Sequence, residues 1–289
     1  MGAWRFAGEG MSRPFLPMLI RTRIVRYHPP MCRLAAYLGP EISLEQLLLE
    51  PEHSLYRQAR EPRELVYTKI NADGYGFGWY APDGRPAVYT SLLPIWSDGN
   101  LPHLARSLSR PLWLAEVRSA TNGQPVLPSN TPPFCDNRHL FMHNGFIGEF
   151  HLQVRPAMQA MLSPAIAADI QGNTDSEYLF ACLRQLLADN PHHSPDVALG
   201  ELLELLAEWV DEQPALLNIV VTEGKRLYAG RHALNHDCPS LYYTTDDELF
   251  PGGQLIASER FTDDSFWQPV PEHHILILDA DKPPELLEL

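Results

Sequence analysis

Short apolar runs separated by turn residues dominate the second half of this 289-residue chain and limit the folds open to it. Five runs lie at 216–221, 226–229, 241–245, 255–257 and 274–278, with turn residues about every ten positions. Such a meander is typical of antiparallel sheet. The first half adds strand patterns at 33–38, 112–117 and 139–142, and a hairpin in which an Asp83-Gly84 turn joins 76–80 to 87–90. We therefore expect an antiparallel β-rich core.

Helical patterns are fewer and stand between the two groups of strands. Residues 174–187 start with the capping residue Thr174, have Glu177 three positions later and carry an apolar stripe. A second amphipathic helix is predicted over 199–210, and a short one over 43–49 with Ser43 as its cap. Residues 158–173 are interpreted as a linker or lid, and the end of the chain from 279 as a loose tail. This order fits two antiparallel sheets packed face to face, with helices on the outer faces.

The first thirty residues differ from the rest, with five arginines and a single acid, Glu9. The apolar stretch 14–20 is too short for a secretory signal and is interrupted by Pro17. We expect a misplaced start codon, with translation beginning at Met31; a removed propeptide is the alternative. The predicted organisation is a leader over 1–31, one catalytic domain over 32–280 and a tail over 281–289.

Charge and cysteine usage exclude several classes of function. The chain carries −14, and without the leader the balance is −18, which disfavours nucleic acids and anionic membranes. The sequence contains no apolar run near 18 residues that could span a membrane.

Four widely spaced cysteines indicate reduced thiols in the cytoplasm. Cysteine and histidine nowhere show zinc-ligand spacing, and the adjacent pairs His192-His193 and His273-His274 are interpreted as loop residues, so no metal or cofactor is expected.

Cys32 follows Met31 directly, and this makes it the main candidate nucleophile. Removal of Met31 would leave a first residue with both a thiol and a free α-amine. The pKa of an α-amine is about 8, against about 10.4 for lysine, so the amine can act as the base for its own thiol. Most free cysteines are instead buried core residues, and Met-Cys alone does not decide between the two.

Four further motifs carry possible chemistry, and each has an ordinary structural explanation. Glycines alternate with aromatics over 71–79, which indicates either a tightly packed strand or the approach of a ligand. Arg118 ends a strand, where it could bind a carboxylate or form a surface ion pair. Asn144-Gly145 could supply two oxyanion donors or simply make a turn. Asp175 begins a helix, where it could bind an ammonium or interact with the helix dipole.

The order of these motifs resembles the class II glutamine amidotransferases, a branch of the N-terminal-nucleophile hydrolases. Met-Cys, Arg-x-Ala-Thr-x-Gly, His-Asn-Gly and Thr-Asp-Ser-Glu occur in that order. The resemblance implies an α+β fold, a four-layer α/β/β/α sandwich of two antiparallel sheets. It also implies roles for particular residues: Cys32 as nucleophile, Asn144 and Gly145 as the oxyanion hole, and Arg118, Thr121, His143 and Asp175 in substrate binding. Ser119 and Asn122 stand where many members have Trp and His, which suggests a changed pocket rim.

Additional segments are similar to the γ-glutamyl hydrolases of ergothioneine biosynthesis. They are 72–78, 117–121, 131–134 and 257–271. This resemblance implies a small γ-glutamyl substrate, γ-glutamyl-hercynylcysteine sulfoxide, which is hydrolysed to glutamate through a cysteinyl thioester. The alternative is a glutaminase that supplies ammonia from L-glutamine to a partner synthase. A third possibility, a non-catalytic binding domain, would predict loss of Cys32, Arg118, Asn144 or Asp175, and all four are present.

Overall fold

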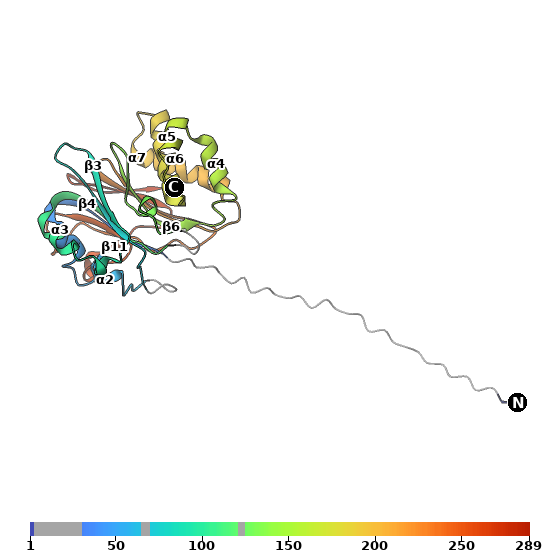
Figure 1. Cartoon of the computed structure of the whole chain (residues 1–289), viewed down its shortest axis with the longest axis horizontal. Helices are drawn as coiled ribbons and strands as arrows, with labels where there is room; N and C mark the ends of the chain where they lie inside the picture. Colours follow the sequence, from blue (N-terminus) through green and yellow to red (C-terminus); the bar gives the residue numbers. More distant parts are fainter. Residues whose placement is uncertain (3–30, 65–69, 121–124) are drawn as a thin grey trace.

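Two antiparallel sheets form the centre of the molecule (Figure 1). The computed structural model describes residues 1–2, 31–64, 70–120 and 125–289. The predicted leader over 1–31 therefore lies almost wholly outside the described residues, as do Thr121 and Asn122. One sheet has seven strands in the order β11-β9-β10-β1-β4-β2-β3, and the other has six in the order β13-β12-β8-β7-β6-β5.

The predicted strand patterns all overlap strands of these sheets. The seven-stranded sheet contains β1 (Arg33–Ser43), β2 (Tyr75–Tyr80), β3 (Pro86–Ser91), β4 (Ser109–Val117), β9 (Tyr242–Thr244), β10 (Gln254–Ala257) and β11 (Gln268–Pro269). The six-stranded sheet contains β5 (Phe134–Cys135), β6 (Leu140–Ile147), β7 (Ala215–Thr222), β8 (Arg226–Leu234), β12 (His274–Asp279) and β13 (Lys282–Glu288).

Helices lie on the outer face of each sheet. They are α1 (Leu44–Leu48), α2 (Leu55–Gln58), α3 (Leu101–Ser107), α4 (Val154–Met161), α5 (Pro164–Ala168), α6 (Asp175–Asp189) and α7 (Pro195–Trp209), with 3₁₀ turns η1 (Ile95–Ser97), η2 (Pro128–Asn130) and η3 (Asp264–Phe266). The predicted caps are present: Ser43 forms a capping box with Gln46, and the Thr174 hydroxyl accepts from the Glu177 N–H at 3.3 Å. None of the described helices is long and apolar enough to cross a membrane.

Three apolar clusters separate four layers. Alternate residues of both sheets, such as Leu114 of β4 and Met142 of β6, fill the space between the sheets. A second cluster joins α1, α2 and α3 to the outer face of the seven-stranded sheet. A third joins α4, α6 and α7 to the outer face of the six-stranded sheet. The predicted α/β/β/α sandwich is confirmed.

The segment expected as a linker or lid is largely helical. Residues 158–173 contain the end of α4 and all of α5. Met158 is fully buried in the cluster beneath α6, and this packing stabilises a helix that the sequence pattern left weak. Pro164 occupies the first turn of α5, where its missing N–H costs nothing.

The C-terminal residues are not a loose tail. Residues 282–288 form β13, which pairs antiparallel with β12 from His274↔Glu288 to Asp279↔Lys282. Pro283 and Pro284 argue against a central strand, but β13 lies at the edge of its sheet, where proline is tolerated.

Candidate active site

Cys32 lies immediately before β1, against the residue that follows Arg118. The Ser119 N–H donates to the Cys32 Sγ at 3.4 Å, and the thiol lies 3.8 Å from the Ser119 carbonyl oxygen. Ser119 itself is buried. The thiol is thus held by the backbone at the end of β4, and the described chain places it at the edge of the space between the sheets.

The pairing of β1 with β4 brings two charged side chains beside the thiol. Arg33 pairs with Val117 and Leu34 with Glu116, so Cys32 lies next to Arg118 in the same ladder. Glu116 and Arg118 follow Leu114 at steps of two residues, so their side chains point to the same face as Leu114, toward the six-stranded sheet. Both are at least 96% buried, since Glu116 is 1% and Arg118 4% exposed.

Asn144 reaches the same place from the opposite sheet. It lies on β6 two residues after Met142, which packs between the sheets, and its Nδ2 donates to the Cys32 carbonyl oxygen. The amide and the thiol are therefore neighbours although they come from strands of different sheets. One donor of the predicted oxyanion hole therefore lies beside Cys32, the predicted nucleophile.

Asn144-Gly145 is not a turn. Both residues lie inside β6, where Asn144 pairs with Asn218 and Gly145 with Leu217 of β7. A Cβ on Gly145 would lie only 1.8 Å from the Leu216 carbonyl oxygen, so no larger residue fits without moving β7. Glycine is required here by close backbone approach.

Comparison with known proteins identifies the family of this chain. The sequence profile of the class-II glutamine amidotransferases matches residues 62–250. A γ-glutamyl-hercynylcysteine sulfoxide hydrolase of Mycobacterium tuberculosis is 33% identical over 85% of this chain and 92% of its own length. This chain belongs to the class II glutamine amidotransferases.

Solved structures agree with this membership. A class-II domain protein from Silicibacter pomeroyi is 26% identical, with a TM-score of 0.64, and the match covers 89% of this chain and 99% of that one. The glutamine phosphoribosylpyrophosphate amidotransferase of Bacillus subtilis shares the fold at 14% identity, with a TM-score of 0.62, over 89% of this chain and 49% of that one. The class II chain described here is therefore an enzyme of the amidotransferase and hydrolase type.

Not all of the predicted site residues gather around Cys32 in this class II chain. His143 lies on the opposite face of β6 from Asn144. Its Nε2 is 3.0 Å from the Leu216 carbonyl oxygen and its Nδ1 is 3.0 Å from the Ser176 hydroxyl. Burial lowers the pKa of His143, and the nearby Asp175 opposes that effect. A neutral ring that donates from Nε2 and accepts at Nδ1 satisfies both contacts.

Asp175 shares that outer face. Its two carboxylate oxygens accept from the N–H groups of Ile147 and Ser176, each at 2.8 Å. His143 and Asp175 thus join the end of β6 to the first turn of α6. The structure brings Cys32, Arg118 and Asn144 together, whereas it places His143 on the far side of the sheet.

Glu116 is the residue of this site that the sequence predictions missed. Apart from the neighbouring Cys32 thiol, its carboxylate has no hydrogen-bond partner among the described residues. Loss of water raises its pKa to about 8, while Cys32 and Arg118 act in the opposite direction. The signal was present in the sequence, because Glu116 is the single acid inside the apolar run 112–117.

The electrostatic surroundings of Cys32 oppose a thiolate in the chain with Met31 attached. Burial raises the pKa of the thiol, and the Glu116 carboxylate raises it further. The Ser119 N–H and the Arg118 guanidinium lower it. These effects together favour the neutral thiol at Cys32.

Unpaired polar atoms lie on Arg118 and Asn144 beside Cys32, and on Asn218, which pairs with Asn144 between β6 and β7. Arg118 Nη1, Asn144 Oδ1 and Asn218 Oδ1 are buried without a hydrogen-bond partner in the described part of the chain. Buried polar groups are normally paired, so this group indicates a place for a polar ligand. The two amide oxygens can accept hydrogen bonds and the guanidinium carries a positive charge, which suits a ligand with both donor and anionic groups.

Proposed function

We propose that this chain hydrolyses γ-glutamyl amides through a thioester on Cys32, and that its substrate is γ-glutamyl-hercynylcysteine sulfoxide. The observation that carries the proposal is the meeting of Cys32, Arg118 and Asn144, which come from strands of both sheets. The substrate is supported by the hydrolase relative of that name, of which the match covers 92%. Free thiols at all four cysteines support a reducing compartment, and we assign the reaction to the cytoplasm.

The reaction begins once Met31 has been removed. The freed α-amine of Cys32 takes the thiol proton, and the sulfur attacks the δ-carbonyl carbon of the γ-glutamyl group. Asn144 Nδ2 and the Gly145 N–H then stabilise the oxyanion. Cleavage of the amide transfers the amine's proton to the leaving nitrogen and leaves a γ-glutamyl thioester. Water hydrolyses the thioester, releases glutamate and restores the thiol.

Two charged residues are proposed for the head group of the substrate. Arg118 has an unpaired Nη1 and can hold the α-carboxylate through parallel hydrogen bonds. The family resemblance assigns the α-ammonium to Asp175, whose carboxylate accepts from the Ile147 and Ser176 N–H groups at the end of β6 when no substrate is bound. Thr121 belongs to the same proposed site.

The decisive experiment measures glutamate release by protein expressed from Met31. γ-Glutamyl-hercynylcysteine sulfoxide and L-glutamine are offered in parallel. We expect kcat/KM to favour the sulfoxide by at least about 100-fold, the scale of a few kcal/mol of leaving-group recognition. Cys32→Ala should abolish release from both substrates and leave the melting temperature unchanged. Full turnover by Cys32→Ala would contradict the mechanism.

The same assay separates the alternative function. Preference for L-glutamine would identify a glutaminase that supplies ammonia to a partner synthase, which the class-II amidotransferase match also allows. A chain that retains residues 1–31 lacks the free amine and should release glutamate far more slowly with either substrate. Equal activity with and without those residues would show that the α-amine is not the base.

A further inference from the structure

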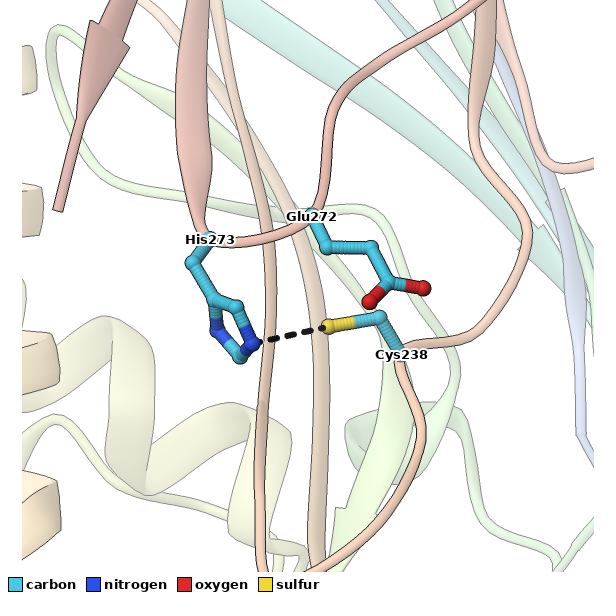
Figure 2. Close-up of side chains that lie close together, drawn as sticks. All are labelled: Cys238, Glu272 and His273. Carbon is cyan, nitrogen blue, oxygen red and sulfur yellow. Dashed lines mark hydrogen bonds between the residues drawn. The ribbon is translucent and has the colours of Figure 1, made fainter.

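Three side chains with different ligand chemistry converge at the rim of the molecule (Figure 2). Cys238 comes from the segment between β8 and β9, and Glu272 and His273 directly precede β12. One donor atom from each lies within 4.8 Å of the others. Figure 2 shows the Cys238 sulfur pointing at the His273 ring, with Sγ 4.0 Å from Nε2 and the Glu272 carboxylate beside them.

The His273 ring is held by a second histidine. Its Nδ1 is 3.0 Å from the Nδ1 of His232, and the two rings meet edge to face. When His273 Nδ1–H donates, its Nε2 keeps a free lone pair directed toward Cys238. Metal-bound histidines are usually fixed in this way, by a hydrogen bond from the ring nitrogen that does not bind the metal. His273 has a φ of 58°, in the left-handed region that few non-glycine residues adopt and in which histidine is enriched.

We propose that Cys238, Glu272 and His273 form a binding site for a zinc-like divalent cation, with water as the fourth ligand. Thiolate, imidazole and carboxylate are all zinc ligands, at roughly 2.3, 2.0 and 2.1 Å. Tetrahedral coordination at these lengths needs a sulfur–nitrogen separation of about 3.5 Å, so the pair closes by only about half an ångström. The cation displaces the Cys238 proton to solvent as it binds.

Arg231 forms an ion pair with Glu272, but this contact is weak enough for Glu272 to bind a metal instead. It lies 3.5 Å from Glu272, and it also donates to the carbonyl oxygens of Pro239 and Val270, at 2.7 and 2.6 Å. These backbone contacts hold the guanidinium while the half-exposed Glu272 turns to a metal. The cation therefore replaces a long and exposed ion pair, which contributes little stability.

The site shares an apolar cluster with the residue that precedes Cys32. Cys238 and Met31 both pack against Phe146, Leu216 and Ala233. A cation on Cys238 would join this cluster to the start of β12. Its expected role is to crosslink the segment between β8 and β9 to the residues that precede β12. This role does not depend on which amide the enzyme hydrolyses.

Zinc and cobalt titrations of the reduced, metal-stripped full chain test the proposal. We expect one zinc per chain by calorimetry and a thiolate-to-cobalt charge-transfer band with cobalt. Cys238→Ser should abolish the band and weaken zinc binding at least about 100-fold. Glu272→Gln should weaken binding but keep the band. His232→Gln, which removes only the supporting ring, should weaken binding about 10- to 100-fold.

Two control variants make a negative result informative. Cys135→Ser removes an exposed thiol elsewhere, and Cys32→Ala removes the catalytic thiol; both should bind zinc as the unmodified chain does. The proposal is overturned if zinc does not bind stoichiometrically, if Cys238→Ser binds normally, or if Cys32→Ala abolishes binding. Equal melting temperatures of metal-free Cys238→Ser and the unmodified chain would show that any loss of binding is not a folding defect.

Discussion

At the residue scale, Glu116 is the side chain whose state decides the charge of the candidate site. It is buried between two strands beside a thiol and a guanidinium, and apart from the thiol it has no hydrogen-bond partner among the described residues. Its pKa is raised from its ordinary value of 4.5 to about 8, because the ionised form has lost water. Near neutral pH, the folded protein thus holds a proton that the unfolded chain has released.

This shift predicts how stability varies with pH. The contribution of Glu116 is fully present below pH 4.5 and is lost as the pH rises toward about 8. Relative to Glu116→Gln, the unmodified full chain should lose up to about 1.4 kcal/mol of unfolding free energy per pH unit in that window. Urea unfolding at pH 5, 6.5 and 8 measures this difference. Glu52→Gln, at an exposed position, is the matched control. A stability difference between Glu116→Gln and the unmodified chain that does not change with pH would contradict a raised pKa at Glu116.

At the element scale, β6 fits β7 only because residue 145 has no side chain. Gly145→Ala places a methyl group 1.8 Å from the Leu216 carbonyl oxygen, so the ladder must shift and Asn144 must move from Cys32. We expect a loss of at least about 3 kcal/mol in unfolding free energy and of nearly all activity. Gly230→Ala on β8 is the matched control, because its methyl group meets the side chains of Leu199 and Leu203, with the nearest atom at 3.4 Å. Comparable effects of the two substitutions would argue against a specific requirement at 145.

The last strand allows a second comparison of neighbouring residues. Leu287 of β13 packs against the cluster under α6 and α7, whereas Leu286 is 40% exposed. Leu287→Ala should therefore cost about 1–2 kcal/mol of unfolding free energy, somewhat less than a fully buried leucine. Leu286→Ala should cost less than about 0.5 kcal/mol. Urea titration of both variants tests whether β13 is a structural strand, and equal small effects would mean that it is not.

At the scale of the whole molecule, the two sheets share one core and should unfold together. Leu114 of β4 is fully buried in the cluster that also contains Met142 and Val220 of the other sheet. Leu114→Ala should lower the unfolding free energy by about 2–5 kcal/mol and keep a single transition. Tryptophan fluorescence and far-ultraviolet circular dichroism should then give the same midpoint. Two separate midpoints would show that the sheets unfold independently.

Several features follow from local pattern and are confirmed by the structure. Alternation and turn residues indicated the strands, and the caps Ser43 and Thr174 indicated where two helices begin, because these signals depend only on near neighbours in the chain. The order of the motifs indicated the family. The helical character of 158–173 and the pairing of β13 were not predicted, since both depend on burial against distant residues.

Tertiary structure alone decided which side chains share the candidate site. The pairing of β1 with β4 set Glu116 and Arg118 beside Cys32, and the packing of two sheets added Asn144. Alternation along β6 turned the adjacent His143 to the opposite face. Cys238 and His273 meet across 35 residues, a separation without any recognisable ligand spacing. Local sequence patterns carry the periodicity of an element, whereas contacts between elements arise from register and packing, which no short segment encodes.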